Sequence, residues 1–195
     1  MDDNRIPKDL AGHFLISETD LLDPNFFRSV VLITDHGQEG AFGLIVNRAA
    51  HVCMQDILPE FTDCAAGQIP VFIGGPVEQQ YLFLLHDGLG GISLPGPSTM
   101  PVDGVFFQPL TENIAKVLRE TYVRGSHKIH IFAGYSGWEN GQLEMELDQG
   151  AWLVHPASSG IVFHPDPEKG WKDAMSSKGD LYRIIAQTGF KPSIN

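Results

Sequence analysis

Cysteine is scarce in this chain. The two cysteines among 195 residues, Cys53 and Cys64, cannot form the disulfide framework that stabilises small secreted domains. A chain of this length buries about 70% of the surface that it exposes when unfolded, so it needs no bridge to hold a core. We therefore expect two free thiols and one domain that spans residues 1–195, close to the usual size of roughly 100–200 residues per domain.

Basic residues are also few. Thirteen lysines and arginines stand against 24 aspartates and glutamates, which gives a formal net charge of −11. The basic residues are scattered singly along the chain, whereas nucleic-acid binding depends on clustered Lys and Arg contacts to phosphates. Nucleic acid is therefore not expected as a partner. A transcriptional regulator, acting directly or through a partner, is kept only as an alternative function.

Long hydrophobic runs are absent. The run "SVVLIT" (29–34) is far shorter than the ~20 residues that cross a bilayer. The opening residues "MDDNRIPKDLAGHF" lack the basic segment and the apolar segment of a secretory signal. We predict a cytoplasmic protein with no membrane partner.

Motifs for metals and cofactors are missing as well. The sequence has no H-E-x-x-H and no C-x-x-C. His127 and His130 are expected on opposite faces of a strand, where they cannot share a metal. The glycine-rich stretch "HDGLGGIS" (86–93) lacks the third glycine of a dinucleotide-binding turn, and no helix is expected after it. The prediction is no metal and no cofactor.

Short apolar runs between turn residues dominate what is present. They predict nine or ten strands, and a helical spacing of apolar residues predicts about four helices. In the clearest helix, Leu110, Ile114 and Leu118 recur four apart and Gly125 follows as a stop. The main expected strands cover residues 12–17, 28–34, 40–47, 70–75, 81–86, 104–109, 128–134, 151–156 and 181–187. The expected helices cover residues 54–58, 110–122, 141–149 and 167–177.

The stretch "AGYSGWENGQLEME" (133–146) raises the question of a serine nucleophile. In a G-x-S-x-G elbow the second glycine follows the serine by two residues, but here Gly137 comes one residue early and Trp138 takes its place. The simpler interpretation is a tight turn at Gly134 and Gly137, with Trp138 packed against the core. A hydrolase that uses Ser136 with a distant histidine is kept as an alternative.

The same stretch carries a family resemblance. The pattern G-x-x-G-W-x-x-x-Q-L-E-x-E resembles a signature of the YqgE/AlgH family of bacterial proteins, and so do "GHFLIS", "DPNFFRSVVLI", "GAFGLIVNR", "GGPV" and the "KPSIN" ending. Two prolines typical of the family are replaced here, by "SETD" after the first strand and by "AA" after Arg48. The position of Ser136 is often alanine in the family, which weakens the hydrolase alternative.

The resemblance implies an α+β fold: one domain with a strongly curved mixed β-sheet that approaches a pseudo-barrel, flanked by about four helices. It transfers no reaction, because the family's biochemical activity is not established. The family's name reflects a proposed regulatory link to exopolysaccharide synthesis.

The resulting prediction is a binding or regulatory module, not an enzyme, whose partner is a small molecule or a protein. The ligand, if the site binds one, is expected to be a small anion held where strands end and loops begin. Arg48 has a second interpretation, which is a structural ion pair with Glu144 or Glu146. The candidate ligand-binding residues are Arg28, Ser29, Asn47, Arg48, Gly74, Gly75, Gln142 and Glu144.

Overall fold

The structure is a computed structural model that describes residues 7–189. Ten strands join in one sheet, in which the order β10-β1-β2-β3-β9-β6-β8-β7 is extended by β5, beside β9, and by β4, beside β5. The strands are β1 (His13–Ser17), β2 (Val30–Gly37), β3 (Gly40–Ile45), β4 (Ala49–Cys53), β5 (Pro70–Ile73), β6 (Val77–His86), β7 (Thr99–Val102), β8 (Val105–Pro109), β9 (Ile129–Glu139) and β10 (Trp152–Pro156).

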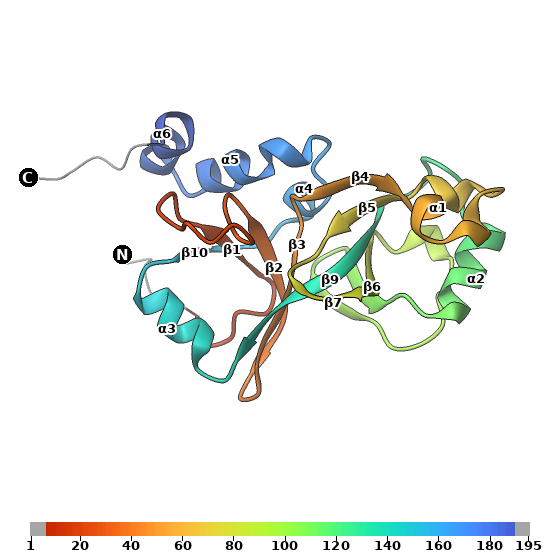
Figure 1. Ribbon diagram of the computed structural model, residues 1–195, viewed down its shortest axis with the longest axis horizontal. Coiled ribbons are helices and arrows are strands. Elements are labelled where there is room, and N and C mark those ends of the chain that lie inside the picture. The colour runs from red at the N-terminus through yellow and green to blue at the C-terminus, as the bar shows by residue number, and fades with distance from the viewer. Residues whose placement is uncertain (1–6, 190–195) are drawn as a thin grey trace, which may run out of the picture.

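Strand β9 joins the two halves of the sheet. Its first half pairs with β5 in parallel and with β6 antiparallel, and its last four residues pair with β3. The sheet branches at this strand and curls into a half-barrel (Figure 1). The predicted fold class, an α+β domain with a strongly curved mixed sheet, is confirmed.

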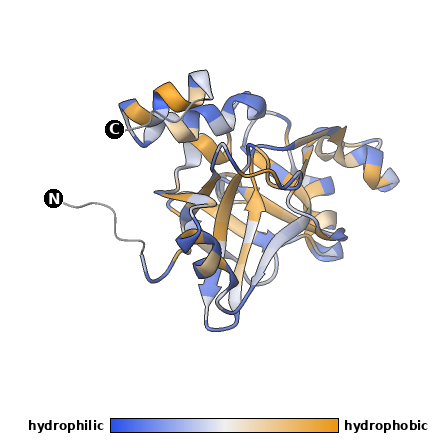
Figure 2. Ribbon diagram, turned by 60° about the vertical axis from the view of Figure 1, so that its left-hand side comes forward, coloured by the Kyte–Doolittle hydropathy of each residue, from blue (hydrophilic) through white to orange (hydrophobic). Residues whose placement is uncertain are grey.

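Helices close the open faces of the sheet. Figure 2 shows the apolar residues running along the strands, while polar residues gather on the helices and loops. Helix α3 covers the core around Trp138, α5 covers the core around Phe132, and α2 covers the core around Ile131. The α-helices are α1 (Met54–Ile57), α2 (Glu112–Thr121), α3 (Gln142–Asp148), α4 (Ser159–Val162), α5 (Pro167–Ser177) and α6 (Asp180–Thr188), and the 3-10 helices are η1 (Pro59–Phe61), η2 (Ala65–Gln68) and η3 (Leu89–Gly91).

Helix α6 replaces a predicted strand. The β propensities of Tyr182 and of the pair Ile184–Ile185 favoured a strand over 181–187, but residues 180–188 are helical. The helix buries Ile185 and Ala186, and it lies against α5. Packing of one helical face onto α5 outweighs the local propensity, which is only a weak preference.

Three other elements differ from the expectation. The short elements β4 and α4 were not predicted, and the described residues hold six α-helices where about four were expected. The segment "PVEQQ" was predicted as a connection, but Val77 already pairs with β9 and the segment belongs to β6 from Val77 onward. Cys53 and Cys64 are both free and half-buried.

No α-helix within residues 7–189 is long and apolar enough to cross a membrane. The longest, α5, has 11 residues.

Candidate functional site

Asn47 and Arg48, at the exit of β3, hold the loop between β1 and β2. The Asn47 side chain accepts a hydrogen bond from the Val30 amide at 2.7 Å and donates to the Arg28 carbonyl at 2.9 Å. The Arg48 guanidinium donates to the carbonyls of Asn25, at 2.6 Å, and Phe27, at 3.4 Å. Both side chains therefore serve loop backbone groups that strand pairing leaves without partners.

Arg28 and Ser29 belong to the same loop. Ser29 is fully buried; its amide donates to the Ser17 hydroxyl at 2.9 Å, and its own hydroxyl donates to the Phe26 carbonyl at 2.9 Å. Arg28 has a left-handed backbone, with φ at 49°. Its guanidinium lies 5.2 Å from the centre of the Phe27 ring and 5.4 Å from that of Trp171. The geometry thus gives both residues a structural role in this loop.

An Arg48→Ala variant should lower the free energy of unfolding by about 1–2 kcal/mol, because two hydrogen bonds from a charged donor are lost from a half-buried site. Burial lowers the pKa of Arg48, and the nearby Asp23 opposes that shift. Urea denaturation of the variant measures the loss. Arg124→Ala, at an exposed position, is the control and should stay within about 0.5 kcal/mol of the parent. Equal stability of the two variants would show that Arg48 is not a structural clamp.

Gly74 and Gly75 lie against β9 and use their backbone groups internally. The Gly74 amide donates to the Ala133 carbonyl at 2.9 Å, and its carbonyl accepts from the Ile45 amide at 2.8 Å. A side chain on Gly75 would meet the Tyr135 carbonyl oxygen at 2.1 Å. The two glycines therefore permit close packing of two strands. Their backbone is near Arg48, whose carbonyl accepts from the Ile73 amide at 2.9 Å.

Gln142 and Glu144 lie at the other end of β3 from this group. Glu139, at the end of β9, pairs with Gly40, at the start of β3, and α3 follows from there. Figure 1 shows α3 near the lower tip of the β2–β3 hairpin, whereas β4 begins at the opposite end of β3. The structure thus brings six of the eight candidate residues together and separates the two on α3 from them.

The second interpretation of Arg48, an ion pair with Glu144 or Glu146, is wrong, since Arg48 donates to two loop carbonyls instead. Glu144 lies 3.0 Å from His36 Nε2. One oxygen of Glu146 accepts from both indole N–H groups, at 2.9 Å from Trp138 and 2.8 Å from Trp152. Glu146 therefore fastens α3 to two strands.

Ser136 is not on a turn. It lies inside β9, which continues through Glu139, so the predicted tight turn between Gly134 and Gly137 is wrong. Its side chain is fully buried, and its hydroxyl donates to the Gly74 carbonyl at 3.2 Å. A nucleophile must reach a substrate and a base at hydrogen-bond distance. The buried hydroxyl of Ser136 instead joins β9 to the residue that follows β5.

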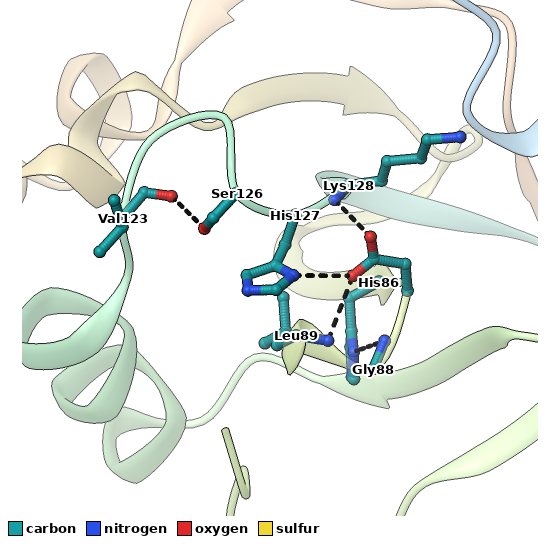
Figure 3. Close-up of polar contacts among 8 residues, drawn as sticks. His86, Gly88, Leu89, Val123, Ser126, His127 and Lys128 are labelled. Atoms are coloured by element: carbon teal, nitrogen blue, oxygen red, sulfur yellow. Dashed lines mark hydrogen bonds and ion pairs between the residues drawn. The ribbon is translucent and has the colours of Figure 1, made fainter. Parts of the chain in front are cut away.

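The histidines near β9 have structural surroundings. Burial lowers the pKa of His130 to about 4, its ring stacks on Phe72 with centroids 4.3 Å apart, and its Nδ1 lacks a partner among the described residues. His127 Nδ1 lies 3.6 Å from Asp87, whose carboxylate also accepts from the Lys128 amide at 2.8 Å. Figure 3 shows the neighbouring Ser126 hydroxyl directed at the Val123 carbonyl and away from His127, so these residues form no catalytic triad.

A cavity of about 760 Å³ lies between β6, η1 and α2, and we call it the β6–α2 cavity. Its apolar lining is partly exposed, and Tyr81 at the rim is 54% exposed. Within residues 7–189, no three side chains of His, Cys, Asp or Glu lie close enough together to hold a metal ion. The lining residues are Leu58, Glu60, Phe61, Gln80, Tyr81, Leu82, Phe83, Pro109, Leu110, Thr111, Glu112, Ala115, Lys116, Arg119 and Glu120.

Helix α2 forms one wall of this cavity. The Thr111 side chain caps the helix by accepting from the Ile114 amide at 3.4 Å. Ile114 and Leu118 are buried in the core, and the residues that line the cavity follow one another at helical spacing on a different side. The helix was predicted from its apolar spacing, but the cavity beside its polar side was not.

Sequence comparison identifies relatives over nearly the whole chain. The family model described as AlgH-like (DUF179) matches residues 14–183. A UPF0301 protein of Streptomyces avermitilis is 36% identical over 200 residues, covering 95% of each chain. Another, from Thioalkalivibrio sulfidiphilus, is 35% identical over 184 residues, covering 92% of this chain and 95% of its own.

Two solved structures share the fold. The crystal structure of protein DIP2367 from Corynebacterium diphtheriae has a TM-score of 0.75 and 25% identity, and the match covers 95% of this chain and 94% of that one. The solution structure of the AlgH protein from Pseudomonas aeruginosa has a TM-score of 0.72 and 28% identity, with 97% and 98% covered. These names carry no reaction, ligand or partner. With a family model that matches residues 14–183, the chain belongs to the AlgH-like family.

Proposed function

We propose that the chain is a cytoplasmic binding module without catalytic chemistry of its own, and that its ligand occupies the β6–α2 cavity. The observation that supports the proposal is the cavity itself, because sites for ligands are concave, mostly apolar and typically about 300–1,000 Å³ in volume. At about 760 Å³ the β6–α2 cavity falls within this range.

The lining suits recognition better than chemistry. Its apolar part includes Leu58, Leu82 and Leu110, all partly exposed although the core beside them is closed. Its polar part consists of side chains on η1, β6 and α2 and of Thr111, whose hydroxyl already caps α2, and the lining includes no serine, cysteine or histidine. Binding without covalent catalysis is the role that this set of residues supports.

The hydrolase alternative receives no support from the surroundings of Ser136. Its hydroxyl is buried and bonded to a backbone carbonyl, and Ser136 does not line the cavity. A regulatory role would then be exercised through what the cavity binds.

A fluorescent apolar probe tests the proposal. We expect Nile red, an uncharged apolar dye, to bind the folded protein, and Ala115→Trp, which fills the cavity, to weaken that binding at least tenfold. Asn113→Trp, on the same helix but outside the lining, is the matched control and should bind the probe as the parent does. Thermal melting confirms that each variant is folded, and Lys116→Trp, at an exposed lining position, is a second blocking variant if Ala115→Trp does not fold.

Equal binding of the probe by the parent, the blocking variant and the control variant would overturn the proposal. So would a folded parent that binds no probe.

A further inference from the structure

Strand β6 extends beyond its neighbour β8 and leaves a free edge. The ladder between the two strands ends at the pair Phe83 and Pro109, and the Leu110 amide then donates to the Leu82 carbonyl at 2.8 Å. In an extended strand, alternate residues direct their N–H and C=O groups to the same side. Since the Leu82 carbonyl faces the β8 side, this alternation over residues 80–82 places the backbone groups of Gln80 on the same side.

The first half of β6 is also displaced from β9. Val77 pairs with Tyr135 and Leu82 pairs with Ala133, so four residues of β6 stand opposite a single residue of β9. Those four residues, 78–81, are all exposed, and Glu78 has a left-handed backbone with φ at 44°. Among the described strands, none pairs with residues 78–82 on the β8 side.

The free edge borders the β6–α2 cavity. Residues 80–83 line one side of the cavity, and residues 109–112 and α2 line the other. The cavity therefore lies where a strand in line with β8 would run. An extended peptide that adds a strand to a sheet edge obtains affinity from main-chain hydrogen bonds, and it obtains specificity from pockets for alternate side chains. Phe61 and Leu110 offer an apolar floor for such side chains.

The charge of the lining indicates the composition of the peptide. Three glutamates and two basic residues line the cavity, Glu78 stands next to the free edge, and the whole chain carries a net charge of −11. A basic segment would complement this surface. Resting on the binding function proposed above, we infer that the ligand is an extended segment of a partner protein, apolar at alternate positions and basic at the others, which adds to β6 as a strand.

The competing interpretation is a solvated edge. Natural proteins protect sheet edges with bulges and charged side chains, and the segment around Glu78 has both. The two interpretations differ in one measurable property, because only strand addition requires the backbone N–H and C=O groups of the edge.

A synthetic probe measures that requirement. The acetylated and amidated hexapeptide Lys-Val-Lys-Val-Lys-Val should bind the full chain, with amide chemical shifts perturbed over residues 80–83 and along α2. The same peptide with alternate backbone N-methyl groups should bind at least tenfold more weakly, since it keeps the side chains and loses the donors. Glu-Val-Glu-Val-Glu-Val should also bind more weakly, because its charge repels the lining.

Two proline variants test the protein side. Gln80→Pro removes an N–H that faces the β8 side and should weaken binding of the lysine peptide at least tenfold. Gln79→Pro removes an N–H that alternation places on the opposite side, and it should bind like the parent provided that melting shows both variants folded.

Equal binding by the N-methylated and unmodified peptides would overturn the inference. The inference would also be overturned if neither peptide bound. The proposed binding function of the cavity would still stand in that case if Ala115→Trp weakened binding of the fluorescent probe. Loss of both peptide and probe binding by the parent would reject the two proposals together.

Discussion

Glu146→Ala is expected to lower the free energy of unfolding by about 3 kcal/mol, because one carboxylate serves two indole N–H groups. Trp138 and Trp152 are each only 5% exposed, and both donate to the same oxygen of Glu146. A hydrogen bond to a charged group contributes about 1.5–3 kcal/mol, and a buried donor left without a partner costs about 1–3 kcal/mol. The carboxylate itself is half-buried, so water can compensate part of the loss, and we expect the lower part of the summed range.

The expected loss is measured by urea denaturation followed through tryptophan fluorescence. Glu144→Ala is the matched control, two residues away on the same helix. The Glu144 side chain is 55% exposed. Within the described residues, its one ion pair is with the His36 ring. An ion pair whose carboxylate is largely exposed to water contributes about 0–1 kcal/mol. If both variants lost the same stability, the two indole hydrogen bonds would not be the cause.

The positions of most strands along the chain could be predicted from the sequence, since their apolar runs indicate burial directly. The run Val30–Ile33 is fully buried, and so are most residues of β1. Runs of this kind between turn residues favour strands because they are short and rich in β-branched residues. The curvature of the sheet was predicted from the family resemblance and not from the apolar runs.

Neither helix α6 nor the structural role of the polar residues at the strand ends could be predicted from the sequence, and the reason is the same for both. Whether Tyr182 and Ile185 form a strand or a helix depends on the face that α5 offers, which is not visible in seven residues. Polar residues at the strand ends suggested a ligand site around Asn47. In the structure, the side-chain donors of Asn47 and Arg48 instead bond to carbonyl groups of the neighbouring loop. Local sequence shows which groups can donate, whereas the tertiary structure decides what accepts.

The β6–α2 cavity also could not be predicted from local sequence. Its lining comes from residues 58–61, 80–83 and 109–120, three segments that no local pattern connects. The stretch "PVEQQ" looked like a turn because it is polar, and in the structure it forms the free edge of a strand. A short polar segment lacks the alternation of apolar residues by which a half-buried strand is predicted.

The glycines of "GGPV" were predicted as candidate ligand-binding residues, whereas in the structure they allow close packing against β9. Gly75 is the sharpest case: an added Cβ would lie 2.1 Å from the Tyr135 carbonyl oxygen, 2.2 Å from its carbon and 2.4 Å from the Ser136 nitrogen. All three atoms belong to the backbone of β9, which is held by pairing with β3, β5 and β6. No side-chain rotation can relieve these contacts.

Gly75→Ala should therefore lower the free energy of unfolding by more than about 4 kcal/mol or prevent accumulation of folded protein, an effect as large as the most damaging single substitutions. The φ angle of Gly75 is not in the left-handed region, so crowding alone accounts for the loss. Gly160→Ala is the control: its Cβ would meet nothing within 4 Å, its φ is ordinary, and it lies in α4. That change should be neutral or stabilise by up to about 1 kcal/mol, because alanine favours the helix. Soluble yield and urea denaturation measure the stability of the two variants. A Gly75→Ala protein as stable as Gly160→Ala would show that β5 and β9 are not packed this closely.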